Sequence, residues 1–254
     1  MWNQLRTDAY EGMIAETATI TGWHGDRVSA YFSRPLGAGP FPGVVLIPHL
    51  PGWDELNREV ARRFTQHGFM VACPNIYQRF GQGTPEEVAK SAQQAGMVPD
   101  DSVMADVKGS LDYLKSLPSS NGKVGVIGMC SGGRHAFLAG CRVEGVDAVV
   151  ECWGGRVVQS KDELTPSMPV APIDLTAQLG CPMIGIFGND DKFPSPEQVD
   201  QHEAALKKEG KDYTFYRYDG AGHAIWNYTR DAYRAEAAMD SWNKALAFFD
   251  ERLR

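Results

Sequence analysis

Short apolar runs alternate with amphipathic stretches along most of the chain. Continuous apolar runs suit strands that are buried on both faces of a sheet, and they occur at residues 43–47, 69–73, 123–129, 146–151 and 183–187. Helical spacing of apolar positions occurs at residues 57–66, 86–94, 100–116, 131–141 and 197–209. Residues 213–218 resemble one further strand. Residues 231–252 predict a long amphipathic C-terminal helix, with Met239 on the apolar stripe that is expected to face the core.

The order of these elements predicts the class of fold. Residues 16–20 and 27–33 alternate in polarity and predict two antiparallel strands joined by a turn at residues 23–26. Strands and helices then alternate, which predicts an α/β fold with a mostly parallel central sheet and helices on both faces. Residues 156–179 show no clear period and contain three prolines, so we expect a loop there, with one short helix, that covers the site.

Length and charge narrow the possible partners. With 254 residues, we expect a single domain over residues 1–254. The formal net charge of −7 and the lack of a polybasic run argue against nucleic acid or an acidic membrane surface as partner. The first residues lack a secretory pattern, and no run approaches the roughly 18 apolar residues of a membrane span. We expect a cytoplasmic monomer acting on a small molecule.

The cysteines suggest neither a disulfide framework nor a metal site. Their number is odd and no pair has CxxC spacing, so no metal or other cofactor is expected. Four of them lie in or beside apolar runs and are expected to be buried thiols. The five are Cys73, Cys130, Cys141, Cys152 and Cys181.

The surroundings of Cys130 differ, because an apolar run ends there in Gly-x-Cys-x-Gly and a helical pattern follows. This pattern predicts a strand, a sharp turn and a helix, with the side chain at the tip of the turn exposed. The free N–H groups at the start of the helix favour a thiolate and can hold an oxyanion. A small buried hydrophobic residue is the alternative interpretation of Cys130.

Two later turns add an acid and a histidine. An apolar run ends in Phe-Gly-Asn-Asp-Asp at residues 187–191, and a strand-like run is followed by Asp-Gly-Ala-Gly-His at residues 219–223. The resulting order of nucleophile, acid and His differs from the orders of the two main serine protease families. Asp190 and Asp191 are adjacent, and the residues alone leave both open as the acid.

Six motifs in a specific order carry a resemblance to a known family. They are residues 47–53, residues 73–79, the turn at Cys130, residues 152–155, the acidic turn and the His loop. With them the chain resembles the dienelactone hydrolase (carboxymethylenebutenolidase) family of α/β-hydrolases, whose nucleophile is a Cys. The resemblance implies the α/β-hydrolase fold and hydrolysis of a lactone or ester bond of a small substrate through a thioacyl intermediate.

The resemblance also implies roles for individual residues. Cys130 is the expected nucleophile and His223 its proton partner. The family pattern of a glycine followed three residues later by the acid selects Asp191, whereas counting back from Pro194 favours Asp190. The oxyanion hole is expected to consist of the backbone N–H groups of Leu50 and Ser131.

Substrate recognition follows from the same resemblance. Arg79 matches a family Arg that binds the carboxylate of the lactone, a use that suits the planar guanidinium. The second such Arg falls at Asn227, for which Arg230 is a possible substitute. An aromatic pocket is expected, with core packing as the alternative for each of its members. Those members are Trp53, Tyr77, Trp153 and Trp226.

One position departs from the family. His49 stands where the family carries a Glu that interacts with the resting thiol. We expect His49 either to make Cys130 more thiolate-like or to face away and bond a backbone carbonyl.

Two other functions fit the same residues. A carboxylesterase or thioesterase for a bulkier substrate would use the same scaffold. A redox sensor based on Cys130 would not be an enzyme and would not need the acid, the His and the oxyanion loop.

Overall fold

The computed structural model describes residues 12–231 and 233–254, and its eight strands form one sheet. The strand order is β1-β2-β4-β3-β5-β6-β7-β8. β1 pairs with β2 and β2 with β4 in antiparallel fashion, and the remaining pairs are parallel. The strands are β1 (Met13–Thr21), β2 (Arg27–Pro35), β3 (Phe41–Ile47), β4 (Met70–Pro74), β5 (Ser120–Met129), β6 (Ala148–Cys152), β7 (Met183–Gly188) and β8 (Tyr213–Tyr218).

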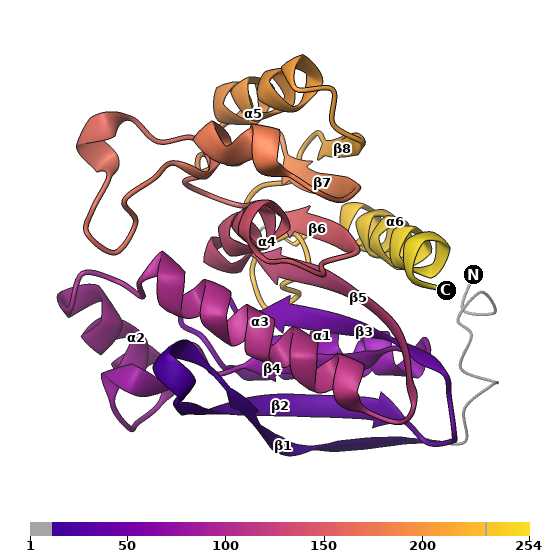
Figure 1. The fold of residues 1–254 in the computed structure, drawn as a ribbon. Coiled ribbons are helices and arrows are strands. Elements are labelled where there is room, and N and C mark those ends of the chain that lie inside the picture. Colours follow the sequence, from indigo (N-terminus) through magenta and orange to yellow (C-terminus); the bar gives the residue numbers. More distant parts are fainter. Residues whose placement is uncertain (1–11, 232) are drawn as a thin grey trace.

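Helices cover both faces of this sheet. They are α1 (Glu55–Gln66), α2 (Pro85–Gln94), α3 (Asp100–Ser116), α4 (Ser131–Arg142), α5 (Pro196–Lys208) and α6 (Ala235–Leu253). Figure 1 shows α3 and α4 across one face, with α1 and α6 on the other. Each face has its own cluster of buried apolar side chains, one including α3 and α4 and the other α1 and α6. The predicted α/β architecture is therefore confirmed.

Two expected elements differ in detail. α6 begins at Ala235 and not at residue 231, because Arg234 has the extended backbone of a helix cap, with φ −124° and ψ 104°. Its buried stripe is also rotated, so that Met239, expected in the core, is 46% exposed. The loop after β6 contains two 3₁₀ helices, η4 (Lys161–Glu163) and η5 (Pro172–Gln178), where one short helix was predicted.

The sheet register brings the predicted turns together. In the parallel pairs Ile47 lies beside Gly128, Met129 beside Cys152, and Gly188 beside Tyr218. The chain segments that leave these strand ends therefore meet at one edge, where ligands bind in open α/β sheets. Within the described residues, no helix is both long and apolar enough to cross a bilayer.

Candidate active site

Cys130 occupies a sharp turn between the last residue of β5 and the first residue of α4. Its φ of 55° lies in the left-handed region, which side chains other than Gly rarely adopt, and backbone strain of this kind gathers at functional sites. The backbone N–H of Cys130 donates to Cys152 O at 3.0 Å. The turn thus holds a half-buried thiol at the start of a helix.

Close backbone packing explains the glycines that follow the turn. A Cβ on Gly132 would lie 2.3 Å from Ile47 O, and one on Gly133 would lie 2.5 Å from Cys152 O. The start of α4 is thereby pressed against the chain leaving β3 and β6, and any larger residue would push it away.

His223 contacts Cys130 on one side and Asp191 on the other. Its Nδ1 lies 2.7 Å from Asp191 Oδ2, and its side chain also interacts with Cys130. Burial alone would lower the pKa of His223, but the interactions with Asp191 and Cys130 outweigh burial and raise this pKa to about 9. The imidazole is therefore biased toward its charged form next to the thiol.

The two adjacent acids have different surroundings. Asp191 is 6% exposed, and its second carboxylate oxygen accepts a hydrogen bond from the backbone N–H of Phe193 at 2.9 Å. Asp190 is exposed. The geometry therefore favours Asp191, and not Asp190, as the carboxylate that orients His223.

A cavity of about 340 Å³ opens beside the thiol. Leu50, Ser131 and Tyr77 line it together with Cys130. Within the described residues, no hydrogen bond uses the backbone N–H of Leu50 or of Ser131. Two donors are thus available near the sulfur, in the places where an oxyanion hole was expected.

Other walls of this cavity were not predicted. Apolar side chains contribute most of their surface, and only Gly155, in the motif at residues 152–155, belongs to a motif named above. The unpredicted lining residues are Gln93, Met97, Val98, Arg134, His135, Gly155, Arg156, Met168 and Phe193. Arg134 and His135 had one usable signal, since they follow the turn by four and five residues and so lie on the first turns of α4.

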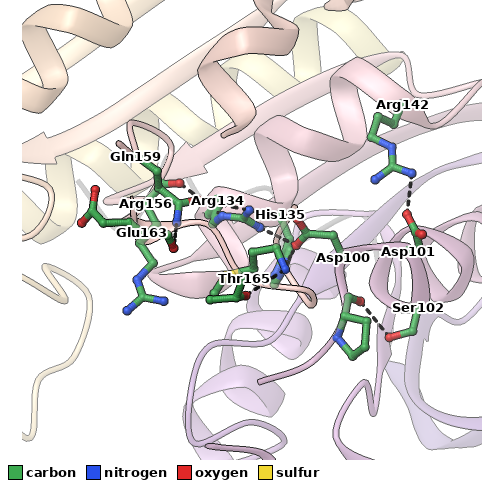
Figure 2. A network of polar contacts seen from close by, with 12 residues as sticks. Asp100, Asp101, Ser102, Arg134, His135, Arg142, Arg156, Gln159, Glu163 and Thr165 are labelled. Atoms are coloured by element: carbon green, nitrogen blue, oxygen red, sulfur yellow. Dashed lines mark hydrogen bonds and ion pairs between the residues drawn. The ribbon is translucent and has the colours of Figure 1, made fainter. Parts of the chain in front are cut away.

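A buried polar network supports this wall. Figure 2 shows Arg134 between Asp100 and the backbone of Arg156. The two terminal nitrogens of Arg134 lie 2.5 Å and 2.9 Å from the two Asp100 oxygens, and its Nε donates to Arg156 O. His135 Nε2 lies 3.2 Å from Asp100. The network ties the starts of α3 and α4 to the loop after β6.

The surroundings of this network also lower the pKa values of Asp100 and His135. Burial alone would raise the pKa of Asp100, but hydrogen bonds from His135 and Arg134 outweigh burial and hold this pKa below its usual value. Burial lowers the pKa of His135. A charged pair of Asp100 and Arg134 beside a neutral His135 is therefore the expected state at neutral pH.

His49 does not line the cavity around Cys130. Its Nε2 lies 2.6 Å from Asp54 Oδ2, and Asp54 also caps α1 by accepting from Asn57 N. His49 therefore bonds a side-chain carboxylate, whereas a partnership with the thiol or a backbone carbonyl had been expected.

Arg79 is not placed as a substrate-binding residue. Its guanidinium donates to both oxygens of Asp26 and to both oxygens of Asp106, at 2.8–3.0 Å. Asp106 is fully buried on α3, so it needs this cation. The prediction that Arg79 binds a substrate carboxylate is corrected here: Arg79 joins the turn at Asp26 to α3.

Three of the four predicted aromatic residues do not line the cavity around Cys130. Trp153 and Trp226 are 2% and 3% exposed, and their rings pack edge to face at 5.6 Å. They belong to the core cluster of α1 and α6, because large aromatics contribute most when fully buried. Trp53 donates its Nε1–H to Cys73 O and faces a neighbouring cleft.

The remaining predicted positions have ordinary partners. Asn227 accepts hydrogen bonds from Thr229, and Arg230 is exposed.

Burial raises the pKa of Cys141 and of Cys181 to about 12, which fits inert thiols. Within the described residues, no group of three or more His, Cys, Asp or Glu side chains is placed to hold a metal ion.

Comparison with known proteins identifies the family. The model of the dienelactone hydrolase family matches residues 28–253. The chain belongs to the dienelactone hydrolase family. Membership confirms the resemblance carried by the six motifs, and it makes the protein a carboxylic ester hydrolase, acting on lactone or ester bonds.

Relatives cover nearly the whole chain. A Methylorubrum extorquens protein named "Putative carboxymethylenebutenolidase" is 31% identical over 248 residues, which span 96% of this chain and 83% of that protein. An Escherichia coli protein of the same name is 30% identical and covers 89% of this chain and 83% of its own length. The crystal structure titled "Putative Dienelactone Hydrolase" from Klebsiella pneumoniae has a TM-score of 0.86 at 26% identity, covering 94% of this chain and 99% of that chain. The predicted α/β-hydrolase fold is confirmed.

Proposed function

We propose that the protein hydrolyses an ester or lactone bond of a small substrate through a thioacyl intermediate on Cys130. The observation that carries this proposal is the contact of the strained, helix-capping Cys130 with His223, whose other nitrogen lies 2.7 Å from buried Asp191. A buried thiol without function needs neither the strain nor the ordered partners.

In the first half of the reaction, the Cys130 sulfur, whose proton has already passed to His223 Nε2, attacks the carbonyl carbon as a thiolate. The negative charge on the carbonyl oxygen is held by the N–H groups of Leu50 and Ser131. The bond to the leaving oxygen then breaks, and His223 returns the proton to that oxygen. Asp191 keeps Nδ1 protonated, so that Nε2 faces the sulfur.

In the second half, His223 takes a proton from water, and the resulting hydroxide attacks the thioester carbon. The carbon–sulfur bond breaks, the acid is released, and the sulfur leaves as a thiolate beside His223, which keeps the proton that it took from water. The largely apolar walls suit an uncharged acyl portion, and the cavity of about 340 Å³ suits a small one.

The name of one relative narrows the proposed substrate class further than the site does. A Bradyrhizobium relative, 28% identical over 228 residues, is named "Probable 2-oxo-3-(5-oxofuran-2-ylidene)propanoate lactonase". A lactone is therefore the first substrate class to test. Because Arg79 is occupied by Asp26 and Asp106, neutral aryl esters belong in the same test. We further propose a cytoplasmic monomer without nucleic acid or membrane partners.

The test is a panel of aryl esters, lactones and a dienelactone, assayed with the purified protein and with Cys130→Ala. We expect Cys130→Ala to lose about 10³-fold or more of the rate with an unchanged circular dichroism spectrum. Acid quenching followed by intact mass measurement should show the acyl group on the wild-type protein only. Retention by Cys130→Ala of more than about a tenth of the rate would overturn the mechanism. Reversible oxidation of Cys130 without turnover of any panel member would favour the redox sensor.

A further inference from the structure

A second cavity adjoins the cavity that contains Cys130, and the two share one lining residue. It has a volume of about 160 Å³, and Tyr77 lines both. Trp53 and Arg58 form one part of its wall. Gly81 and Gly83, whose φ angles of 117° and 148° are positive, form another part. We call this second cavity the Arg58 cleft. Nothing in the proposed reaction uses it.

The Arg58 cleft carries an uncompensated positive charge. Within the described residues, the Arg58 guanidinium makes no ion pair or hydrogen bond, and its buried Nε has no acceptor. The guanidinium lies over the face of Trp53, whose ring centre is 5.3 Å from the guanidinium carbon. A buried N–H without an acceptor is rare in native proteins and calls for a missing partner.

The lining supplies donors and no acid. None of the residues that line the cleft is Asp or Glu. The side-chain amides of Asn75 and Gln82 make no hydrogen bond within the described residues, so their N–H groups are available beside Arg58. Three groups that donate hydrogen bonds thus face one small space.

Nearby carboxylates have other partners. Asp54 binds His49 and Asn57, Glu55 pairs with Arg62, and Glu87 closes the cap of α2 on the backbone of Thr84. The charge of Arg58 is therefore left for a ligand.

We propose that the Arg58 cleft binds a small planar carboxylate. The carboxylate would take hydrogen bonds from Arg58 and Asn75, and the planar body would lie between the rings of Trp53 and Tyr77. A cavity of about 150 Å³ admits a benzene ring, so the size is adequate. Because ester hydrolysis turns an uncharged acyl group into a carboxylate, the ligand has the chemistry of the reaction product, a link that rests on the proposed function.

Benzoate is a suitable probe and benzamide its uncharged counterpart. Calorimetric titration of the Cys130→Ala protein should show benzoate binding and no measurable benzamide binding. Arg58→Gln should weaken benzoate binding by at least about tenfold. Arg63→Gln is the matched control on the same helix, because Arg63 stacks on Trp242 and does not line the cleft, and it should bind as before.

A second variant guards against a folding defect in Arg58→Gln. Asn75→Asp keeps the size of the side chain and adds a negative charge, so it should also weaken benzoate binding. Equal benzoate affinity in Arg58→Gln and its parent would overturn the proposal. A further test alkylates Cys130 of the wild-type protein with N-benzyl iodoacetamide, which fills the cavity around the thiol. Loss of benzoate binding after this alkylation would also overturn the proposal, because it would mean that benzoate binds in the cavity around Cys130.

The two proposals fail in different ways. Titration of the Cys130→Ala protein requires no turnover. Normal ester hydrolysis by the wild type without benzoate binding would overturn the cleft and leave the reaction standing. Benzoate binding that depends on Arg58, in a protein that hydrolyses no ester, would overturn the proposed reaction and leave the binding cleft standing.

Discussion

His223 Nδ1 lies 2.7 Å from Asp191 Oδ2, while Asp190, one residue earlier, is exposed. This difference allows a matched test. Asp191→Asn should lower kcat/KM for an aryl ester by about 10³- to 10⁴-fold, because the amide favours the wrong imidazole tautomer. Asp190→Asn removes a solvated charge and should change kcat/KM for the same ester by less than about threefold. The opposite ranking of the two variants would move the role to Asp190.

The raised pKa of His223 has consequences for stability. Burial lowers this pKa, but Asp191 and Cys130 raise it to about 9, above the ordinary value of 6.5. The stability that comes from charging His223 is therefore fully present below pH 6.5 and is lost as the pH rises through 9. Urea unfolding between pH 6 and 10 should show this loss. In Asp191→Asn the imidazole signal in an NMR titration should shift at a lower pH, and an unchanged midpoint would contradict the assignment.

Asp100 and Asp101 offer another matched pair, and Figure 2 shows the two side chains with different partners. Asp100→Ala leaves the guanidinium of Arg134 buried without its carboxylate, so we expect a loss of about 3–5 kcal/mol in the free energy of unfolding. Asp101 pairs with Arg142 at the surface, and Asp101→Ala should cost about 1 kcal/mol or less. Urea denaturation measures both, and similar losses would mean that the buried network does not stabilise the fold.

Arg79 is now expected to stabilise the fold. Arg79→Gln leaves buried Asp106 without its cation, and we expect a loss of about 3 kcal/mol in the free energy of unfolding. The KM values for neutral and carboxylate-bearing esters should then stay in the same ratio as in the wild type. A selective rise in KM for the carboxylate-bearing esters would restore the role in substrate binding.

Local signals predicted much of the fold. The bounds of α3 agree with the prediction to the residue, because Pro99 and Pro118 limit the helical pattern on both sides. The predicted start of α6 was four residues too early, because the helical pattern of the sequence begins at residue 231 whereas the helix begins at Ala235. Propensity alone does not determine where a helix begins.

The candidate site divides in the same way. Cys130, Asp191 and His223 lie one, three and five residues after the ends of β5, β7 and β8, so the sheet topology brings them to the same edge. The cavity walls depend on the directions of side chains in loops, which tertiary packing decides. Trp153 and Trp226 are an example, because their rings could fill either a pocket or the core, and the core of α1 and α6 contains both.

The glycine packing at the turn concerns the main chain and not the sulfur. The position of residue 130 follows from the contacts of Gly132 with Ile47 O and of Gly133 with Cys152 O, which do not involve its side chain. The backbone position of the proposed nucleophile and the identity of its attacking atom are therefore specified separately. Exchange of sulfur for oxygen at this one residue would change the proposed intermediate from a thioester to an ester without requiring a different backbone.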